Sequence, residues 1–349
     1  MANPAADAER NAFLKYFFQE LASRLPIGQN MAGILEDMLQ VSKGNVYKRM
    51  RGELPLSISE VVLLAKKYDI SLDEWLFRDT GRVSMHFMSL LRPVQSPLEF
   101  LRRLHYLLAR ASQLSGLAIH YATTEMAGFQ YLAFPELTAF KFHMWNRTTW
   151  AIAAYDQPWF SPALYTEDTE LETARMAFLA LWDQTPTCEY WQLHTLENTL
   201  SQLRYMAYEG SFEQPEMPRL LGEQLMELIN IWEKMANTGR KPPSRDQEGQ
   251  ELPGAAFTLY HNEIFHTNNV FLLDSPDRKR VVMTFDNPNN ITTENEAFGN
   301  YTAAFFQKIR AHSQRISEEG EKQRRRFFSA LRVRVLTTNE EIKSIPAHK

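Results

Sequence analysis

The sequence lacks the features that define several classes of protein. It has one cysteine, Cys188, which excludes an internal disulfide framework and a site built from several thiolates. It has no apolar run of about 18 residues or more, so no membrane span is expected. Its N-terminus lacks the basic and apolar regions of a signal peptide. The net charge of −4 argues against a protein that coats nucleic acid over its whole surface. We therefore expect a soluble cytoplasmic protein.

The composition is that of a folded chain with a substantial core. Of the 349 residues, 44% are hydrophobic and 12% are aromatic. A chain of this length accommodates two or three domains. We predict two domains, residues 1–80 and 84–340, and a polar loop at Thr238–Gly254 divides the second into a helical part (84–240) and a strand-containing part (251–340).

The first 80 residues predict an all-α domain of short helices. Apolar side chains recur at three- and four-residue spacing, and good capping residues separate the segments. Ser42 is the expected N-cap of the third helix, and Gly52 occupies the left-handed position that follows it. Ser57 or Ser59 is the expected cap of the fourth. The helices are expected over residues 8–25, 30–41, 43–51, 59–68 and 72–77.

The rest of the chain predicts a larger α/β or α+β domain that is mostly helical. Short runs of β-branched and aromatic residues predict strands near 117–122 and between 256 and 286. The segment around Ser275 predicts a hairpin turn. The predicted fold class is therefore mainly α with a small sheet: an N-terminal all-α domain followed by a larger mixed domain.

The stretch "KGNVYKRMR", Lys43 to Arg51, is basic although the chain is acidic. It carries four cations and no acid. On a helical wheel Val46 and Met50 mark the buried line, so the polar side chains face solvent. Lysine and arginine neutralise phosphate or reach guanine, and asparagine pairs with adenine, so such a helix fits the major groove of double-stranded DNA. The candidate DNA-binding residues are Ser42, Lys43, Asn45, Tyr47, Lys48, Arg49 and Arg51.

The segment from Ile34 to Leu76 resembles the Cro/repressor-type (XRE-like) helix-turn-helix family. It shares the order of helix, turn, Val-Ser, basic helix ending in Arg-Gly, leucine-bearing helix and Ser-Leu-Asp. The matching positions are Leu35, Leu39, Val41, Ser42, Val46, Arg51, Gly52, Ser59, Leu63, Ala65, Ser71, Leu72 and Asp73.

A narrower resemblance extends beyond this segment. The motifs "YKRMRGE", "FPELTAFKFHMW" and "YHNEIF" are similar to a Bacteroidetes-like branch of such regulators with a large uncharacterised C-terminal domain. The resemblance implies a helix-turn-helix transcriptional regulator. One such module reads few base pairs, so we expect a homodimer on a two-fold site, with the C-terminal domain supplying dimerisation or the sensing of a small-molecule effector.

Three positions depart from the family pattern. Glu36 and Gln40 stand where the family usually has a small residue and a glycine, and Arg49 stands where the general family is apolar. The first two favour an alternative in which the helix-turn-helix no longer binds DNA and the protein is a protein-interaction adaptor.

An enzyme in the C-terminal half is the other alternative. "HNEIFH" holds His261, Glu263 and His266, and a cleft that gathered these three would favour it. The histidines are five residues apart on an expected strand, whereas the zinc-protease motif needs a separation of four on a helix. No glycine-rich phosphate loop, nucleophile elbow or paired-carboxylate motif is present. We therefore predict no catalytic residue, no metal site, no cofactor and no enzyme.

Two other stretches have both a structural and a functional interpretation. The basic segment "EEGEKQRRRFFSALRVRV", residues 318–335, fits a helix with acids first and bases later, or a site for phosphate, an acidic ligand or the DNA backbone. The aromatic-rich middle fits a core or a cavity for an apolar or aromatic effector. Its tryptophans are Trp145, Trp150, Trp159 and Trp191. We expect Cys188 to be an inert core thiol.

Overall fold

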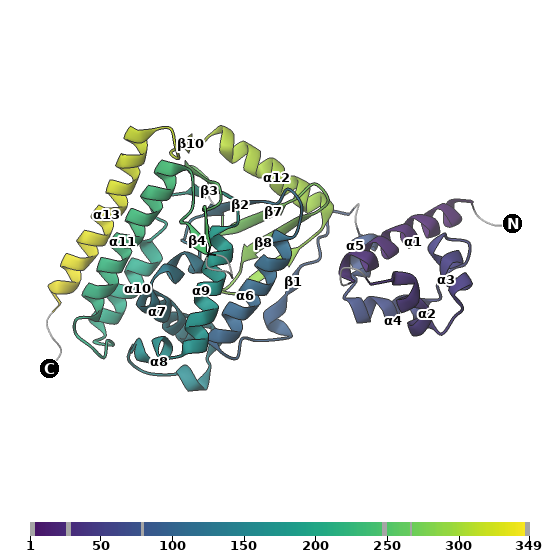
Figure 1. The fold of residues 1–349 in the computed structure, drawn as a ribbon, viewed down its shortest axis with the longest axis horizontal. Helices are drawn as coiled ribbons and strands as arrows, with labels where there is room; N and C mark the ends of the chain where they lie inside the picture. Colours follow the sequence, from purple (N-terminus) through teal and green to yellow (C-terminus); the bar gives the residue numbers. More distant parts are fainter. Residues whose placement is uncertain (1–3, 26–28, 78–79, 246–249, 266, 346–349) are drawn as a thin grey trace. The chain divides into compact units, whose positions relative to one another are not determined.

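A computed structural model describes residues 4–25, 29–77, 80–245, 250–265 and 267–345. The chain divides into two compact units, Met1–Ser84 and Met85–Lys349 (Figure 1). The described secondary-structure elements of the smaller unit are all helices, and the larger unit combines helices with a mixed sheet. The protein as a whole is therefore mixed α and β.

The described part of the smaller unit contains five helices, which confirms the helices predicted there. Apolar side chains from four of them enclose one small core, with Phe17, Leu21, Leu35, Val46 and Leu64 at its centre. The helices are α1 (Pro4–Arg24), α2 (Met31–Leu39), α3 (Lys43–Met50), α4 (Ile58–Tyr68) and α5 (Leu72–Leu76).

The described part of the larger unit is built on an eight-stranded sheet with the order β1-β9-β8-β7-β2-β3-β6-β10. Strands β2, β3 and β6 are parallel neighbours, and every other pair in this sheet is antiparallel. Its strands are β1 (His86–Phe87), β2 (Ala118–Thr123), β3 (Thr187–Trp191), β6 (Phe257–His261), β7 (Val270–Asp274), β8 (Lys279–Thr284), β9 (Asn290–Thr293) and β10 (Gln314–Arg315). A separate ribbon of β4 (Ser244–Arg245) and β5 (Glu251–Leu252) lies within the predicted loop.

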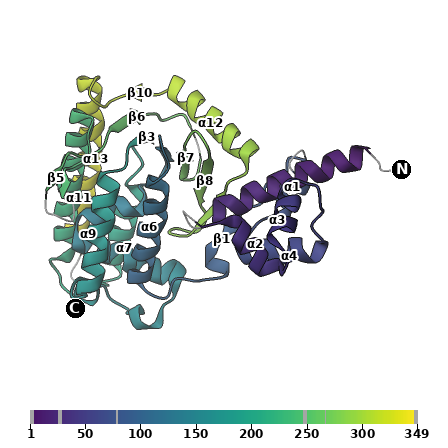
Figure 2. The same ribbon diagram turned by 45° about the vertical axis from the view of Figure 1, so that its right-hand side comes forward.

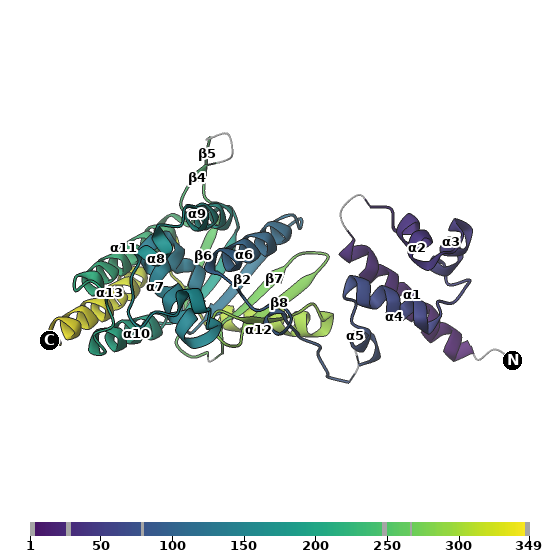
Figure 3. The ribbon, with the colours of Figure 1, turned by 90° about the horizontal axis from the view of Figure 1, so that it is seen from below.

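Helices cover both faces of this sheet. On one face, alternate residues such as Ile119, Trp191 and Leu259 belong to the largest core, together with most of the helices. On the other face, Tyr190 and Tyr260 pack with α12, which lies across β7 and β8 (Figures 2 and 3). The helices are α6 (Pro97–Ser112), α7 (Pro135–Trp145), α8 (Ala163–Thr166), α9 (Thr169–Asp183), α10 (Glu197–Tyr208), α11 (Met217–Thr238), α12 (Glu296–Ala311) and α13 (Glu321–Lys343). Short η elements are η1 (Met88–Leu90), η2 (Gly128–Ala133), η3 (Asn146–Trp150) and η4 (Ala153–Tyr155).

The sheet is larger than the small one expected from the sequence. Strand β2 confirms the strand predicted near 117–122, and it pairs with β7 from the later part. Strand β3 comes from a stretch in which no strand was predicted, and it pairs with β6. The two parts therefore share one sheet. The sequence did not predict β3, because its inward positions include the polar Thr187 and Glu189 rather than apolar residues.

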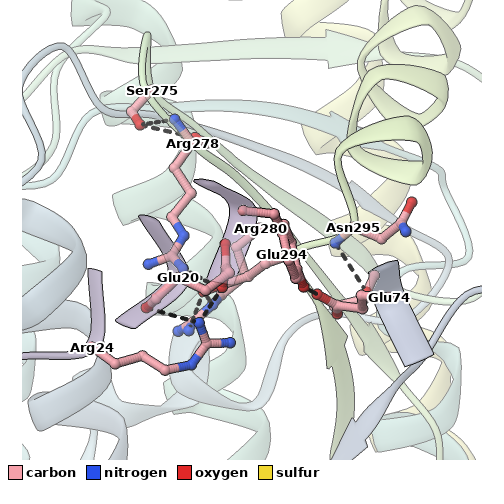
Figure 4. A network of polar contacts seen from close by, with 10 residues as sticks. Glu20, Arg24, Glu74, Ser275, Arg278, Arg280, Glu294 and Asn295 are labelled. Carbon is pink, nitrogen blue, oxygen red and sulfur yellow. Dashed lines mark hydrogen bonds and ion pairs between the residues drawn. The ribbon is translucent and has the colours of Figure 1, made fainter. Parts of the chain in front are cut away.

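The predicted hairpin between β7 and β8 is present. Ser275 accepts a hydrogen bond from the N–H of Arg278 through its hydroxyl at 3.1 Å and donates its own N–H to the Arg278 carbonyl at 3.0 Å (Figure 4). Glu294, which follows β9, accepts from Arg278 Nη2 at 2.5 Å and from Arg280 Nε at 2.7 Å. One carboxylate thus ties β9 to the β8 strand and its turn.

A buried polar network supports β3 from the helical side. Glu189 is 0% exposed, and its carboxylate accepts hydrogen bonds from Thr187 Oγ1 and Trp191 Nε1, both at 2.9 Å. Lys241, also buried, donates to the carbonyl of Trp182 at 3.0 Å, and its Nζ lies 3.5 Å from the Trp182 ring centroid. Burial raises the pKa of Glu189 and lowers that of Lys241, while the attraction between the two opposes both shifts. Burial thus favours the neutral form of each group, and the hydrogen bonds from Thr187 and Trp191 offset part of the cost of burying the Glu189 carboxyl group.

Asp183, at the end of α9, makes the stability of this region depend on pH. Burial raises the pKa of Asp183 to about 7, with Lys241 opposing the shift. Between about pH 4 and pH 7 the folded state keeps a proton that the unfolded chain releases, so stability falls as pH rises through this window. We expect Asp183→Asn to remove this fall. From pH 5 to pH 8, the free energy of unfolding of the wild type should decrease by on the order of 2 kcal/mol relative to that of the variant.

Urea unfolding at the two pH values, followed by tryptophan fluorescence, measures this gain. Six of the seven tryptophans lie in the larger unit. Asp156→Asn, which changes an exposed aspartate, is the matched control and should follow the wild type. An Asp183→Asn variant that loses as much stability as the wild type between pH 5 and pH 8 would contradict the assignment.

Candidate nucleic-acid interface

Helix α3 is held by its apolar line, as the sequence predicted. Val46 is 1% exposed within the small core, and Met50 is partly buried against the same cluster. The opposite side of the helix faces solvent. Its exposed residues are Lys43, Gly44, Asn45, Tyr47 and Lys48, with Ser42 before the helix and Arg51 after it. A Cβ added at Gly44 would meet nothing within 4 Å, so the surface has a gap there.

Arg49 does not belong to this exposed face, contrary to its selection as a candidate site residue. Its side chain is 17% exposed, and Nη1 donates to Glu60 Oε1 on α4 at 2.5 Å. Glu60 is also the acid of a capping box with Ser57, which settles that Ser57 rather than Ser59 caps α4. Arg49 therefore joins α3 to the start of α4, and its guanidinium is engaged within the unit.

Arg51 is exposed but has a local partner. Its Nε and Nη2 donate to the two carboxylate oxygens of Glu53 at 2.6 and 3.1 Å, which lowers the pKa of Glu53. At least half of each side chain is exposed, so this pair is weak and can open for another anion. For Lys43 and Lys48, no carboxylate among the described residues lies within ion-pair distance. The four positive charges of the sequence thus give two unpaired lysines and one loosely paired arginine.

The start of α3 is built differently from the expectation. Ser42 occupies the N-cap position with extended backbone, but its hydroxyl makes no capping hydrogen bond. Glu36 on α2 takes this role: its Oε1 accepts from the N–H of Lys43 at 3.2 Å. The residue that departs from the family pattern therefore caps the basic helix, and it places a negative charge at the helix N-terminus.

The turn between α2 and α3 explains the second departure. Gln40 adopts the left-handed conformation (φ 52°) that favours glycine, and its side-chain amide donates to the Asp37 carbonyl at 2.6 Å. The turn therefore has the backbone geometry of a glycine turn without the glycine. After α3, Gly52 is left-handed (φ 76°), as predicted.

A groove of about 470 Å³ borders the end of α3. Apolar side chains from α1, α2 and α3 form its floor, and Lys15 and Arg51 lie at its rim. The lining residues are Asn11, Leu14, Lys15, Phe18, Gln19, Ala22, Met31, Met50, Arg51 and Gly52.

The histidine and glutamate of the enzyme alternative do meet. His261 Nε2 lies 2.8 Å from Glu263 Oε1, which also accepts from the N–H of Leu193 at 2.6 Å. The His261 ring packs on Phe327 at 4.9 Å between centroids. These contacts connect β6, the segment after β3 and α13. His266, the third member of the proposed set, lies outside the described residues. No group of three or more histidine, cysteine, aspartate or glutamate residues in the described chain could hold a metal ion.

The basic C-terminal segment forms most of α13, and several of its arginines make structural contacts. Arg324 is buried and donates to the carbonyls of Ile316 and Glu319, both at 3.1 Å, and to Asn237 Oδ1 at 2.8 Å. Arg334 pairs with Glu197 at 3.1 Å, and Arg332 pairs with Glu233.

Cys188 lies on β3. Burial raises the pKa of its thiol, which favours the protonated, unreactive form.

Comparisons with known proteins give no match: no family model, no curated protein and no solved structure is similar to this chain. Among the described residues, no helix combines the length and the apolar character needed to cross a membrane.

The pair of Arg49 and Glu60 should act on stability rather than on any ligand. We expect Arg49→Met, which keeps the bulk but removes the guanidinium, to destabilise the smaller unit by about 1–3 kcal/mol. Chemical unfolding followed by helical circular dichroism measures this. The double variant with Glu60→Gln should lose less than the sum of the two single variants, because both remove the same contact. Strictly additive losses would show that the pair is not coupled.

Proposed function

We propose that the protein is a DNA-binding transcriptional regulator that contacts the major groove and its phosphates through the exposed face of α3. The observation that carries the proposal is the composition of that face. Lys43 and Lys48 are free to neutralise phosphate, Asn45 can read a base edge, and Gly44 leaves space for close approach. The helix-turn-helix resemblance of residues 34–76 supports the same function.

The proposal includes a homodimer and a sensing role for the larger unit. A face with so few contacts recognises a short sequence, and two copies on a two-fold site supply the missing specificity. Coupling to an effector requires that the effector bind two states of the protein with different affinity. In the adaptor alternative, which Glu36 favours through the negative charge it brings to α3, the same face meets a protein partner.

A salt series on double-stranded DNA tests the function. We expect the affinity of the full chain for a random duplex to fall steeply between about 50 and 300 mM salt, because bound phosphates release counterions. Lys43→Ala/Lys48→Ala should weaken binding and flatten the slope of log K against log salt by roughly 2, one for each lost phosphate contact.

The matched control is Lys234→Ala/Lys308→Ala, which removes two exposed lysines from the larger unit and changes the net charge equally. It should leave the slope unchanged. No binding of the wild type at low salt, or equal effects of the two double variants, would contradict DNA binding and favour the protein-interaction adaptor.

Gly44→Ala separates stability from binding. Alanine favours a helix over glycine by about 1 kcal/mol, and the added methyl group has open space, so we expect the variant to unfold at higher denaturant concentration. The same methyl group would stand between the α3 backbone and the DNA. We therefore expect weaker DNA binding from a more stable protein, measured by fluorescence anisotropy and by urea unfolding. Unchanged affinity would place Gly44 outside the interface.

A further inference from the structure

Six aromatic side chains gather around α7 in the larger unit, where Figure 1 shows α6, α7 and α8 near one another. Phe100, Trp145 and Trp150 form a triangle with ring centroids 5.2–5.5 Å apart. The Phe142 ring joins them to Tyr165 on α8, which stacks on Tyr155 at 5.2 Å. We call this set the aromatic cluster: Phe100, Phe142, Trp145, Trp150, Tyr155 and Tyr165.

The aromatic cluster contains hydrogen-bond donors that have no acceptor. Trp145 Nε1, Trp150 Nε1 and Tyr165 Oη are buried atoms without a hydrogen-bond partner among the described residues. Trp145 is 2% exposed and Tyr165 is 3% exposed. In the described chain seven buried side-chain atoms lack a partner, and three of them fall in this one cluster. Leaving a buried donor without a hydrogen bond costs about 1–3 kcal/mol. Three such donors in one cluster therefore indicate an acceptor from outside the described chain.

The local backbone holds the donors in place. The chain leaves α7 through a π-helical turn, η3, and Ala151 then adopts a left-handed conformation (φ 52°) that is strained for alanine. Asn146 fixes this turn, because its Oδ1 accepts from the N–H of Ile152 at 2.9 Å. Gly128 makes room for Trp145, since a Cβ there would lie 2.4 Å from the indole ring. A strained turn and an obligatory glycine thus place two tryptophans whose indole N–H groups have no hydrogen-bond partner among the described residues.

The aromatic cluster borders solvent on one side. Phe100, Trp150 and Tyr155 are half-buried, and most of the segment 151–159 is exposed. Asn146 anchors the start of this segment at Ala151 and Ile152. Beyond Ile152, a hydrogen bond from Arg147 Nη1 to the carbonyl of Pro158 at 3.4 Å ties the segment to the end of α7. A small displacement of residues 153–159 would give an entering molecule access to the three donors.

We propose that the aromatic cluster is a binding site for a small neutral aromatic molecule that carries a carbonyl or similar acceptor oxygen. The rings select an aromatic ligand, because offset and edge contacts favour ring pairs. The unpartnered groups are donors, so the ligand must supply a lone pair that accepts hydrogen bonds, which an ammonium cation lacks. No member of the cluster carries a formal charge that would balance an anion. This site does not rest on the proposed DNA binding and can be tested without DNA.

The test compares two molecules of the same shape. Acetophenone has an aromatic ring and one carbonyl oxygen, and 2-phenylpropene replaces that oxygen by a methylene group. We expect the full chain to bind acetophenone saturably and roughly tenfold more tightly than 2-phenylpropene, measured by ligand-observed NMR titration. Tyr165→Phe, Trp145→Phe and Trp150→Phe each remove one donor and keep a ring. At least one of them should reduce the affinity ratio to about threefold or less, while Tyr205→Phe on α10 leaves it unchanged.

The ratio is the decisive quantity, because a loss of packing lowers both affinities together and leaves the ratio intact. Equal affinity for the two molecules, no saturable binding of acetophenone, or an unchanged ratio in all three donor variants would each overturn the proposal. Loss of DNA binding in the salt series would leave this result unaffected, so the two proposals fail separately.

Discussion

The larger unit depends on one strand that is buried on both faces and paired on both edges. Strand β3 lies between β2 and β6 in parallel register, with Glu189 and Trp191 toward the helical layer and Tyr190 toward α12. A parallel strand in this position must be reached by long connections, and those connections supply the helices that cover the sheet. The hydrogen bonds that Thr187 and Trp191 donate to Glu189 allow a carboxyl group to be buried on this strand.

Features that depend on neighbours in sequence were predicted well. The helices of the smaller unit follow from apolar spacing and from caps such as Ser57 and Gly52, which act within one turn. The β7–β8 hairpin follows from its turn residues. Strand β3 was not predicted, because the hydrogen bonds that stabilise the buried Glu189 come partly from residues distant in sequence. One of them is Gln130, whose amide nitrogen lies 3.4 Å from the carboxylate. Inward-facing polar residues hide the alternating pattern that identifies a half-buried strand.

The candidate interface shows the same limit at the level of single charges. The sequence identifies the basic helix and its buried line, but it does not show which cations are engaged. Arg49 is paired with Glu60, eleven residues away on another helix, and Glu36 reaches the start of α3 from α2. These partners alter the sign and strength of the field at the helix without changing the helix itself. Of the four tryptophans noted in the middle region, Trp145 and Trp150 lie in the aromatic cluster, whereas Trp191 donates to Glu189 and Trp159 is exposed. The missing acceptors of Trp145 and Trp150 are visible only in three dimensions.

The order of the strands has a consequence for the newly made chain. Strand β1 pairs with β9, and β2 pairs with β7. The early strands therefore cannot pair until these later segments of the chain have been synthesised. The smaller unit, Met1–Ser84, has its own hydrophobic core, so it can fold while the ribosome is still making the rest. The larger unit cannot complete its sheet until β10, at Gln314–Arg315, has emerged. For most of synthesis, β2 and β3 therefore carry open edges and uncovered aromatic faces, which is the condition under which chaperones engage a nascent chain.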